Sequence, residues 1–205
     1  MLFITILLLI FVFVGGILLG KTISETESKQ ISTFIKENEL NTESYLIEQE
    51  LIKSFDQNNC ELASARIEDL SNELAGIGRK LTEENAKEKL GEENYNFLKR
   101  KYHLMQIKTY ILFKKFIDAC NTKTNIVLYY YSADDQFSAE QGKILDKVVQ
   151  DYDIKVFAIE FNYSSELQFL EEYYNITATP TIIINYKQIY QGLTDYNKIE
   201  EVVSK

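Results

Sequence analysis

Hydrophobic residues recur at helical spacing through the middle of the chain. From Ser24 to about Cys120 there is neither proline nor strand-like alternation, and apolar residues three and four positions apart are typical of amphipathic helices. Four such stretches can be separated: Ile31 to Ile35, Tyr45 to Phe55, Leu62 to Leu81, and Leu98 to Ile117. We predict an α-helical region over residues 21–120, in which the apolar stripes face one another as a packed spacer or coiled-coil hairpin.

The pattern changes after residue 120, where short apolar runs alternate with helical stretches. An uninterrupted apolar run is typical of a central strand that is covered on both faces. The predicted order is strand, helix, strand, linking helix, a two-stranded hairpin and a final helix capped by Asp195. These elements fall at residues 126–131, 137–151, 156–159, 164–174, 181–186 with 188–191, and 195–203. In the helix at 137–151, the residues predicted to face inward are Ile144, Leu145, Val148 and Val149.

Pro180 is the only proline among 205 residues, and it directly precedes the run Thr181 to Ile184. Because proline has no N–H to donate, it fits the first position of a strand. A bond before proline can also adopt the cis form at modest cost. We predict a cis bond between Thr179 and Pro180, which would turn the backbone of the preceding residue away from the sheet.

The segment from Tyr174 to Asn185, with the short strand, Gly192 and the terminal helix after it, resembles the cis-proline half of thioredoxin-like domains. About the last 85 residues take part in the resemblance. The resemblance implies an α/β thioredoxin-like C-terminal domain at residues 121–205. The predicted fold class is this domain preceded by the α-helical region at 21–120 and by an N-terminal transmembrane helix at 1–20, both of which are predicted from the residues themselves.

The same resemblance places the family's Cys-x-x-Cys motif at Asp135-Gln136-Phe137-Ser138, where both cysteines are missing. A thioredoxin uses a thiolate at a helix N-terminus, and neither Asp135 nor Ser138 can form a mixed disulfide. The alternative interpretation of these residues is helix capping, and a minor one is a hydrolytic or metal-binding role for Asp134, Asp135 and Ser138. The resemblance therefore implies a redox-inactive domain.

The resemblance also implies a peptide-docking site that survives the loss of the thiols. In the family, the residue before the cis-proline pairs through its backbone with an extended polypeptide, and the motif loop forms the opposite wall. Carried over to this chain, Thr179 supplies the backbone that pairs with the polypeptide, and Pro180 supplies the cis peptide bond that follows it. The opposite wall is formed by Ala133, Asp134, Phe137 and Ser138. Phe137 is either an exposed apolar contact or a core residue.

The two cysteines, Cys60 and Cys120, each lie 30 residues from position 90, within the polar connection around Lys89 and Gly91. If two helices fold back at that point, equal rise along each brings both cysteines to the same end. We predict a disulfide, which would fit an exported chain. Two unrelated core cysteines and a catalytic thiol are the alternatives.

Residues 1–20 contain no charged side chain and form an almost wholly apolar run. Such a run is just long enough to span a bilayer as a helix. The alternative is a cleaved signal peptide, but no Lys or Arg precedes the run and no small-residue cleavage site follows it. We predict an uncleaved single-pass anchor with the C-terminal domain outside the cytoplasm.

Charge and histidine content exclude several classes of function. The net charge of −9 and the pI of about 4.8 argue against nucleic-acid binding, which needs a basic patch. His103 is the only histidine, so a Ser-His-Asp triad or a multi-histidine zinc site has almost no support. We predict no cofactor and no metal site.

These observations predict a membrane-anchored, redox-inactive thioredoxin-like module that binds a polypeptide or assembles with a membrane-protein partner. The helical region would act as a spacer or as a homodimer interface. Two alternatives remain: a thiol-disulfide oxidoreductase that uses Cys60 and Cys120, and a purely structural module.

Overall fold

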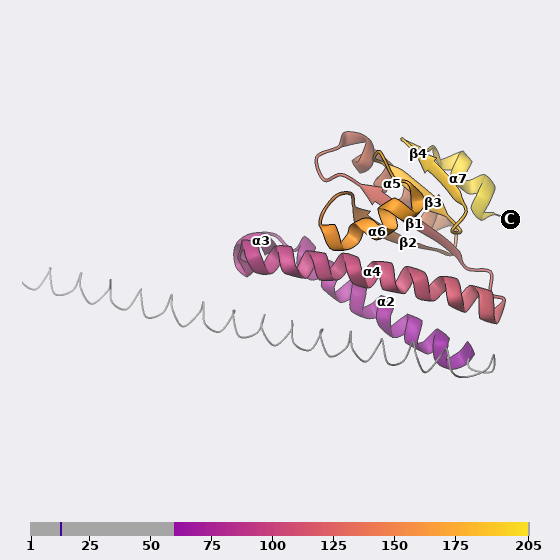
Figure 1. The fold of residues 1–205 in the computed structure, drawn as a ribbon, viewed down its shortest axis with the longest axis horizontal. Coiled ribbons are helices and arrows are strands. Elements are labelled where there is room, and N and C mark those ends of the chain that lie inside the picture. The colour runs from indigo at the N-terminus through magenta and orange to yellow at the C-terminus, as the bar shows by residue number, and fades with distance from the viewer. Residues whose placement is uncertain (1–12, 14–59, 205) are drawn as a thin grey trace, which may run out of the picture.

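The computed structural model describes Phe13 and residues 60–204 (Figure 1). The predicted transmembrane helix at 1–20 and the first two predicted amphipathic helices lie outside the described residues, apart from Phe13. Within residues 60–204, none of the helices has the length and apolar character needed to cross a membrane.

The helical part is a hairpin of α2 (Cys60–Thr82) and α4 (Glu92–Cys120), joined by the short α3 (Ala86–Leu90). These two long helices confirm the last two predicted helical stretches. The chain reverses at Gly91, whose φ of +75° is accessible to glycine without steric cost. The residues of α2 that face inward are Ala63, Ile67, Leu70, Leu74 and Ile77.

Leu62, which we expected on the inward stripe of α2, is instead 59% exposed. One residue along a helix turns the side chain by about 100°, since there are about 3.6 residues per turn. Ala63, four residues before Ile67, takes the buried position in its place.

The sheet has the order β2-β1-β3-β4. Its strands are β1 (Asn125–Tyr131), β2 (Ile154–Glu160), β3 (Thr181–Ile184) and β4 (Gln188–Gln191). Strand β1 pairs parallel with β2 and antiparallel with β3, and β3 pairs antiparallel with β4. With the helices α5, α6 and α7 between and after these strands, this arrangement confirms the predicted thioredoxin-like domain.

Helices cover both faces of the sheet (Figure 1). Helices α5 (Gln136–Asp151) and α7 (Tyr196–Val203) lie on one face, where they bury Val127 and Tyr129. Helix α4, the 3₁₀ turn η1 (Ser165–Leu167) and α6 (Gln168–Tyr174) lie on the other face, over Ile126, Leu128 and Tyr130. Strand β1 is therefore buried on both faces, as its uninterrupted apolar run predicts.

Two details of this domain differ from the prediction. Val149, expected to face inward, is 45% exposed, because Gln141, Leu145 and Val148 already form the buried stripe of α5 at helical spacing. Strand β3 ends at Ile184 rather than at Tyr186. Asn185 and Tyr186 both have positive φ, which ends the extended conformation.

The hairpin and the sheet share one hydrophobic core, which contains residues of α2, α4, β1 and β2. Helix α4 lies between α2 and the sheet, and polar side chains on it are also buried, among them His103, Gln106 and Thr109. The hydroxyls of Tyr110 on α4 and Tyr174 on α6 share a 2.7 Å hydrogen bond. The helical hairpin is thus packed directly on the thioredoxin-like domain.

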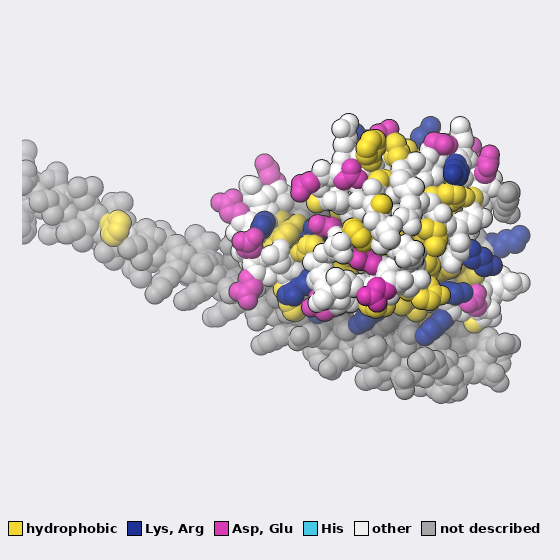
Figure 2. Space-filling view, turned by 45° about the horizontal axis from the view of Figure 1, so that its top comes forward, with side chains coloured by type: hydrophobic (Ala, Val, Ile, Leu, Met, Phe, Trp, Pro, Cys, Tyr) yellow, Lys and Arg dark blue, Asp and Glu magenta, His cyan; other side chains and the backbone are white. Residues whose placement is uncertain are grey.

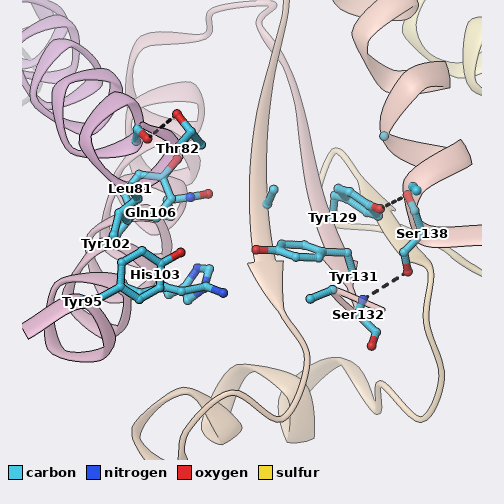
Figure 3. A pocket seen from close by; sticks show the side chains of 16 residues that line it. Leu81, Thr82, Tyr95, Tyr102, His103, Gln106, Tyr129, Tyr131, Ser132 and Ser138 are labelled. Atoms are coloured by element: carbon cyan, nitrogen blue, oxygen red, sulfur yellow. Dashed lines mark hydrogen bonds between the residues drawn. The ribbon is translucent and has the colours of Figure 1, made fainter. Parts of the chain in front are cut away.

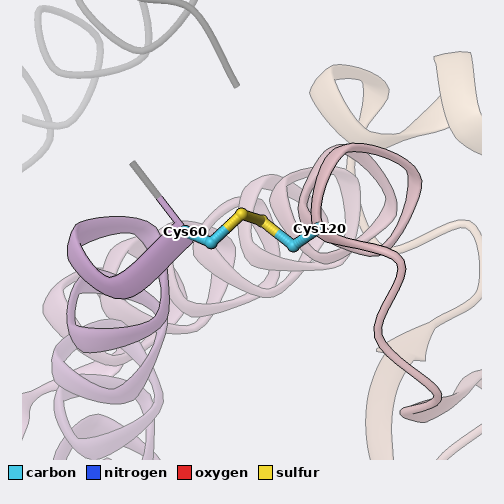
Figure 4. The surroundings of a disulfide bond; sticks show 2 residues. All are labelled: Cys60 and Cys120. Carbon is cyan, nitrogen blue, oxygen red and sulfur yellow. A yellow bond between two sulfur atoms is a disulfide. The ribbon is translucent and has the colours of Figure 1, made fainter. Parts of the chain in front are cut away.

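Cys60 and Cys120 form a disulfide, as predicted, with 5.8 Å between their Cα atoms (Figure 4). They are the first residue of α2 and the last residue of α4. The bridge closes the open end of the hairpin, opposite the turn at Gly91.

Candidate functional site

The bond between Thr179 and Pro180 is cis, as predicted. Pro180 is buried, and its carbonyl oxygen accepts a 2.7 Å hydrogen bond from the amide of Gly192. The hydroxyl of Thr181 donates to the carbonyl oxygen of Ala178 at 2.6 Å. These two hydrogen bonds hold the proline at the start of β3.

Thr179 has a free backbone. It is half-buried, and within the described residues neither its amide nor its carbonyl oxygen takes part in a hydrogen bond. An unpaired peptide group at the end of a strand can pair with an incoming extended chain. Thr179 therefore has the unpaired backbone that the predicted docking edge would need.

The register of the sheet places the motif loop next to this edge. Tyr130 on β1 pairs with Thr181 on β3. Continuing the antiparallel register by two residues brings Ser132 beside Thr179, because paired positions in an antiparallel ladder move in opposite directions. The two predicted walls thus lie at the same end of the β1–β3 pair.

Asp135 caps the N-terminus of α5. Its carboxylate accepts hydrogen bonds from the amide of Phe137 at 3.1 Å and from the amide of Ser138 at 2.9 Å. The hydroxyl of Ser138 donates to the same carboxylate at 2.7 Å. The Ser138 hydroxyl, together with the two amides, lowers the pKa of Asp135. This geometry confirms the capping interpretation of the motif residues.

The hydroxyl of Ser138 is engaged in two hydrogen bonds. Besides donating to Asp135, the hydroxyl accepts a 3.1 Å hydrogen bond from the amide of Ser132. The carbonyl oxygen of Ser138 accepts a further hydrogen bond from the hydroxyl of Tyr129. Ser138 is only 2% exposed, so it supports the loop from beneath and does not present its side chain to a partner.

The other predicted wall residues lie at the surface. Ala133 and Asp134 form an exposed turn, and Phe137 is 59% exposed on the first turn of α5. Phe137 therefore takes the first of its two predicted alternatives, an exposed apolar contact. We call Thr179, Ala133, Asp134 and Phe137 the docking shelf.

A second feature, a cavity of about 540 Å³, lies between the helical hairpin and the domain (Figure 3). Its walls come from α2, α4, the end of β1, the motif loop, α5 and Ala158 of the edge strand β2. Thr179 and Pro180 do not line it. The cavity and the docking shelf are thus separate features that share only Ala133.

His103 forms part of the wall of this cavity. Its side chain is 1% exposed, and its ring nitrogens make no well-formed hydrogen bond within the described residues. Burial, with a smaller effect from the nearby charge of Lys99, lowers the pKa of His103 to about 4. The backbone of Ala158 is close enough to raise the pKa of the ring, against these larger lowering effects. The imidazole is therefore neutral at physiological pH.

Sequence reasoning used His103 only as evidence against a triad or a zinc site, and it did not find the cavity. A signal was present in the sequence. The side chains that α4 contributes to the cavity recur at helical spacing and combine aromatic with polar types: Tyr95, Lys99, Tyr102, His103 and Gln106. A stripe of this kind on an otherwise apolar buried helix face is the local signal of a cavity with aromatic and polar lining residues.

The disulfide lies far from the motif loop. Cys120 precedes β1 and the motif follows it, and the seven residues of β1 extend over about 20 Å. Both cysteines of the chain are engaged in this bond. The structure therefore does not bring a thiol to the docking shelf.

Neither a family model nor a curated protein matches this chain. Three solved structures are similar to parts of it. A malarial protein is 21% identical, over 40% of this chain and 94% of its own, with a TM-score of 0.33. Chloroplastic thioredoxin z is 18% identical, over 43% of this chain and 82% of its own, with a TM-score of 0.36. The oxidised thioredoxin of Plasmodium falciparum is 13% identical, over 45% of this chain and 86% of its own, with a TM-score of 0.34. The assignment of the domain as thioredoxin-like rests on its strand order and helix placement.

Proposed function

We propose that this chain binds an extended polypeptide at the docking shelf without exchanging disulfides. The observation that carries the proposal is the free backbone of Thr179 beside the exposed motif loop. A bound strand would pair with the amide and carbonyl of Thr179, and main-chain pairing of this kind supplies affinity with little dependence on sequence.

Phe137 would supply the apolar part of the contact. A phenylalanine side chain that is 59% exposed gains free energy when a partner covers it, since apolar surface is removed from water. Figure 2 shows both acidic and basic side chains between hydrophobic patches on one face of the described residues, while the whole chain has a net charge of −9. A neutral or basic polypeptide fits this surface better than an acidic one.

The motif residues support binding without redox chemistry. Asp135 and Ser138 hydrogen-bond to each other and to the amides at the start of α5. They hold the shape of the loop that a thioredoxin would use, and they offer no thiolate to attack a disulfide.

Photocrosslinking tests the proposal. A photoreactive residue is placed at Phe137 in the full-length chain in its native membranes, and a matched one at Phe169, which is similarly exposed at 51% but lies on α6. We expect the residue at position 137 to give discrete crosslinked products, seen as bands on a gel. The residue at position 169 should not give these bands. Equal labelling from both positions, or none from either, would count against the docking shelf and favour a purely structural module.

We further propose that residues 1–20 anchor the chain in a membrane, with the domain outside the cytoplasm. The uncharged apolar run and the disulfide between Cys60 and Cys120 support this proposal, because disulfides persist mainly in oxidising compartments. Alkylation of intact cells without reductant is the test. Unmodified cysteines are expected, whereas free, alkylatable thiols would overturn the predicted location.

A further inference from the structure

We propose that the cavity beside His103 binds an uncharged aromatic ring that carries a hydrogen-bonding group, of the size of a phenol or an indole. This goes beyond the proposed function, because Thr179 and Phe137 do not line the cavity. A volume of about 540 Å³ is within the range of small-molecule sites.

The cavity exists because small residues line it where larger ones would fill it. The small lining residues come from α2, the motif loop, α5 and β2, and all face the same space: Gly78, Ala133, Ala139, Gly142 and Ala158. A Cβ atom added at Gly142 would meet no atom within 4 Å. Small side chains on several elements thus leave this space unfilled.

The walls of the cavity are aromatic. Tyr95 and Tyr102 come from α4, and Tyr129 and Tyr131 from β1. Figure 3 shows Tyr131 extending toward α4, where Tyr95 and His103 lie. Aromatic rings favour offset or edge-on contact with another ring, so these walls favour a flat aromatic ligand over a flexible aliphatic one.

His103 supplies the polar recognition. Burying a polar group without a hydrogen bond is costly. The ring of His103 has the backbone of Ala158 near one nitrogen, and the other nitrogen lacks a partner within the part of the chain that the structure describes. A neutral imidazole offers one donor and one acceptor. A phenol hydroxyl or an indole N–H would satisfy one of them.

The charges around the cavity argue for an uncharged ligand. Lys99 is the one charged side chain among the lining residues, and it forms an ion pair with Glu160. Burial raises the pKa of Tyr131, and it raises the pKa of Tyr129 to about 12. Both tyrosine hydroxyls therefore stay protonated at neutral pH. Neither a cation nor an anion would find an unpaired counter-charge there.

The test uses the full-length chain in detergent micelles, labelled with ¹³C and ¹⁵N at histidine. Because His103 is the only histidine, the spectrum contains one imidazole. The probes are p-cresol and indole, with benzoate and benzylammonium as charged rings of similar size. We expect a saturable shift of the His103 resonance with the neutral probes, and at least about tenfold weaker binding of the charged ones.

Gly142→Leu would fill the cavity and is expected to abolish the shift. Gly76→Leu is the matched control, since Gly76 lies on α2, does not line the cavity, and also has no atom within 4 Å of an added Cβ. If the Gly142→Leu chain does not fold, the proposal is tested in the unmodified chain instead. There, nuclear Overhauser contacts between probe protons and His103 are expected. A shift that does not saturate, absent contacts, or unchanged binding in a folded Gly142→Leu chain would overturn the proposal.

The natural ring belongs either to a free small molecule or to a side chain of a bound polypeptide. A tripeptide amide with tyrosine between two alanines separates these sources. Tighter binding of the peptide than of p-cresol identifies a polypeptide side chain, and equal or weaker binding identifies a free molecule. Phe137→Ser should leave p-cresol binding unchanged, so loss of the docking shelf and loss of the cavity site give different results.

Discussion

The hydroxyl of Ser138 donates a 2.7 Å hydrogen bond to the carboxylate of Asp135. These are the first and last residues of the segment where a thioredoxin carries its two cysteines. In this chain the same two positions are connected by a hydrogen bond, and together they close the N-terminus of α5. The segment forms the start of α5 without a cysteine side chain.

Asp135→Ala should lower the stability of the domain, because the amides of Phe137 and Ser138 lose their acceptor. Asp135→Asn keeps an acceptor oxygen and should be milder. The pKa of Asp135 is lowered in the folded state, so its carboxylate stabilises the fold above the unfolded pKa, and this contribution is lost as the pH falls through the folded pKa.

Urea unfolding of the wild type and of Asp135→Asn between pH 2 and pH 6 measures this effect. The difference in stability between the two chains should shrink at the acid end, where both side chains are uncharged. A difference that stays constant over the whole range would mean that the charge of Asp135 contributes nothing to the cap.

The elements that the sequence predicted well are those whose signal lies within a few residues. The apolar run of β1, the helical spacing of α4 and the capping residues Asp135 and Asp195 each depend on local preferences, and each has the predicted structure. The errors at Leu62 and Val149 arise because one residue along a helix changes the face, and only the packed partner shows which neighbour is buried.

The cavity could not be predicted in the same way. It depends on residues that are small or aromatic in elements far apart in sequence, such as Gly78 on α2, Gly142 on α5 and Tyr131 on β1. Only the packing of the hairpin against the domain brings them together. The disulfide between Cys60 and Cys120 was predictable because the two cysteines lie 30 residues on either side of position 90, next to the turn of the hairpin.

Replacing both cysteines, as Cys60→Ser with Cys120→Ser, should destabilise the described part of the chain. The bond joins residues 60 positions apart, and loop-closure entropy for such a span corresponds to about 4 kcal/mol. Urea unfolding of the wild type with and without reductant should show the loss, and the double variant should not respond to reductant. Insulin reduction by the wild type that disappears in the variant would contradict a redox-inactive chain.

Tyr110→Phe should weaken the packing of the hairpin on the domain. The Tyr110 hydroxyl, on a side chain 2% exposed, shares a 2.7 Å hydrogen bond with Tyr174, and a hydrogen bond of this kind contributes about 1 kcal/mol. Tyr173→Phe is the control, because Tyr173 is 75% exposed on the same helix as Tyr174. Equal unfolding free energies for the two variants would show that the tyrosine contact does not stabilise the packing.

His103 should remain neutral down to unusually low pH in the folded chain. Its pKa is lowered to about 4 by burial, and further by Lys99, whereas an unfolded histidine takes up its proton near 6.5. Between these values the unfolded state binds more protons than the folded state, so the free energy of unfolding falls as the pH drops from 6.5 to 4. The loss amounts to roughly 3 kcal/mol at the acid end.

Two measurements check this expectation. The single imidazole resonance should not titrate between pH 8 and pH 5, and a midpoint near 6.5 would show that His103 is accessible to water. His103→Leu should remove its share of the pH dependence of unfolding. The comparison with the wild type is needed because burial raises the pKa of Glu171, and a carboxyl with a raised pKa makes the fold more stable as the pH falls, opposite in sign to His103.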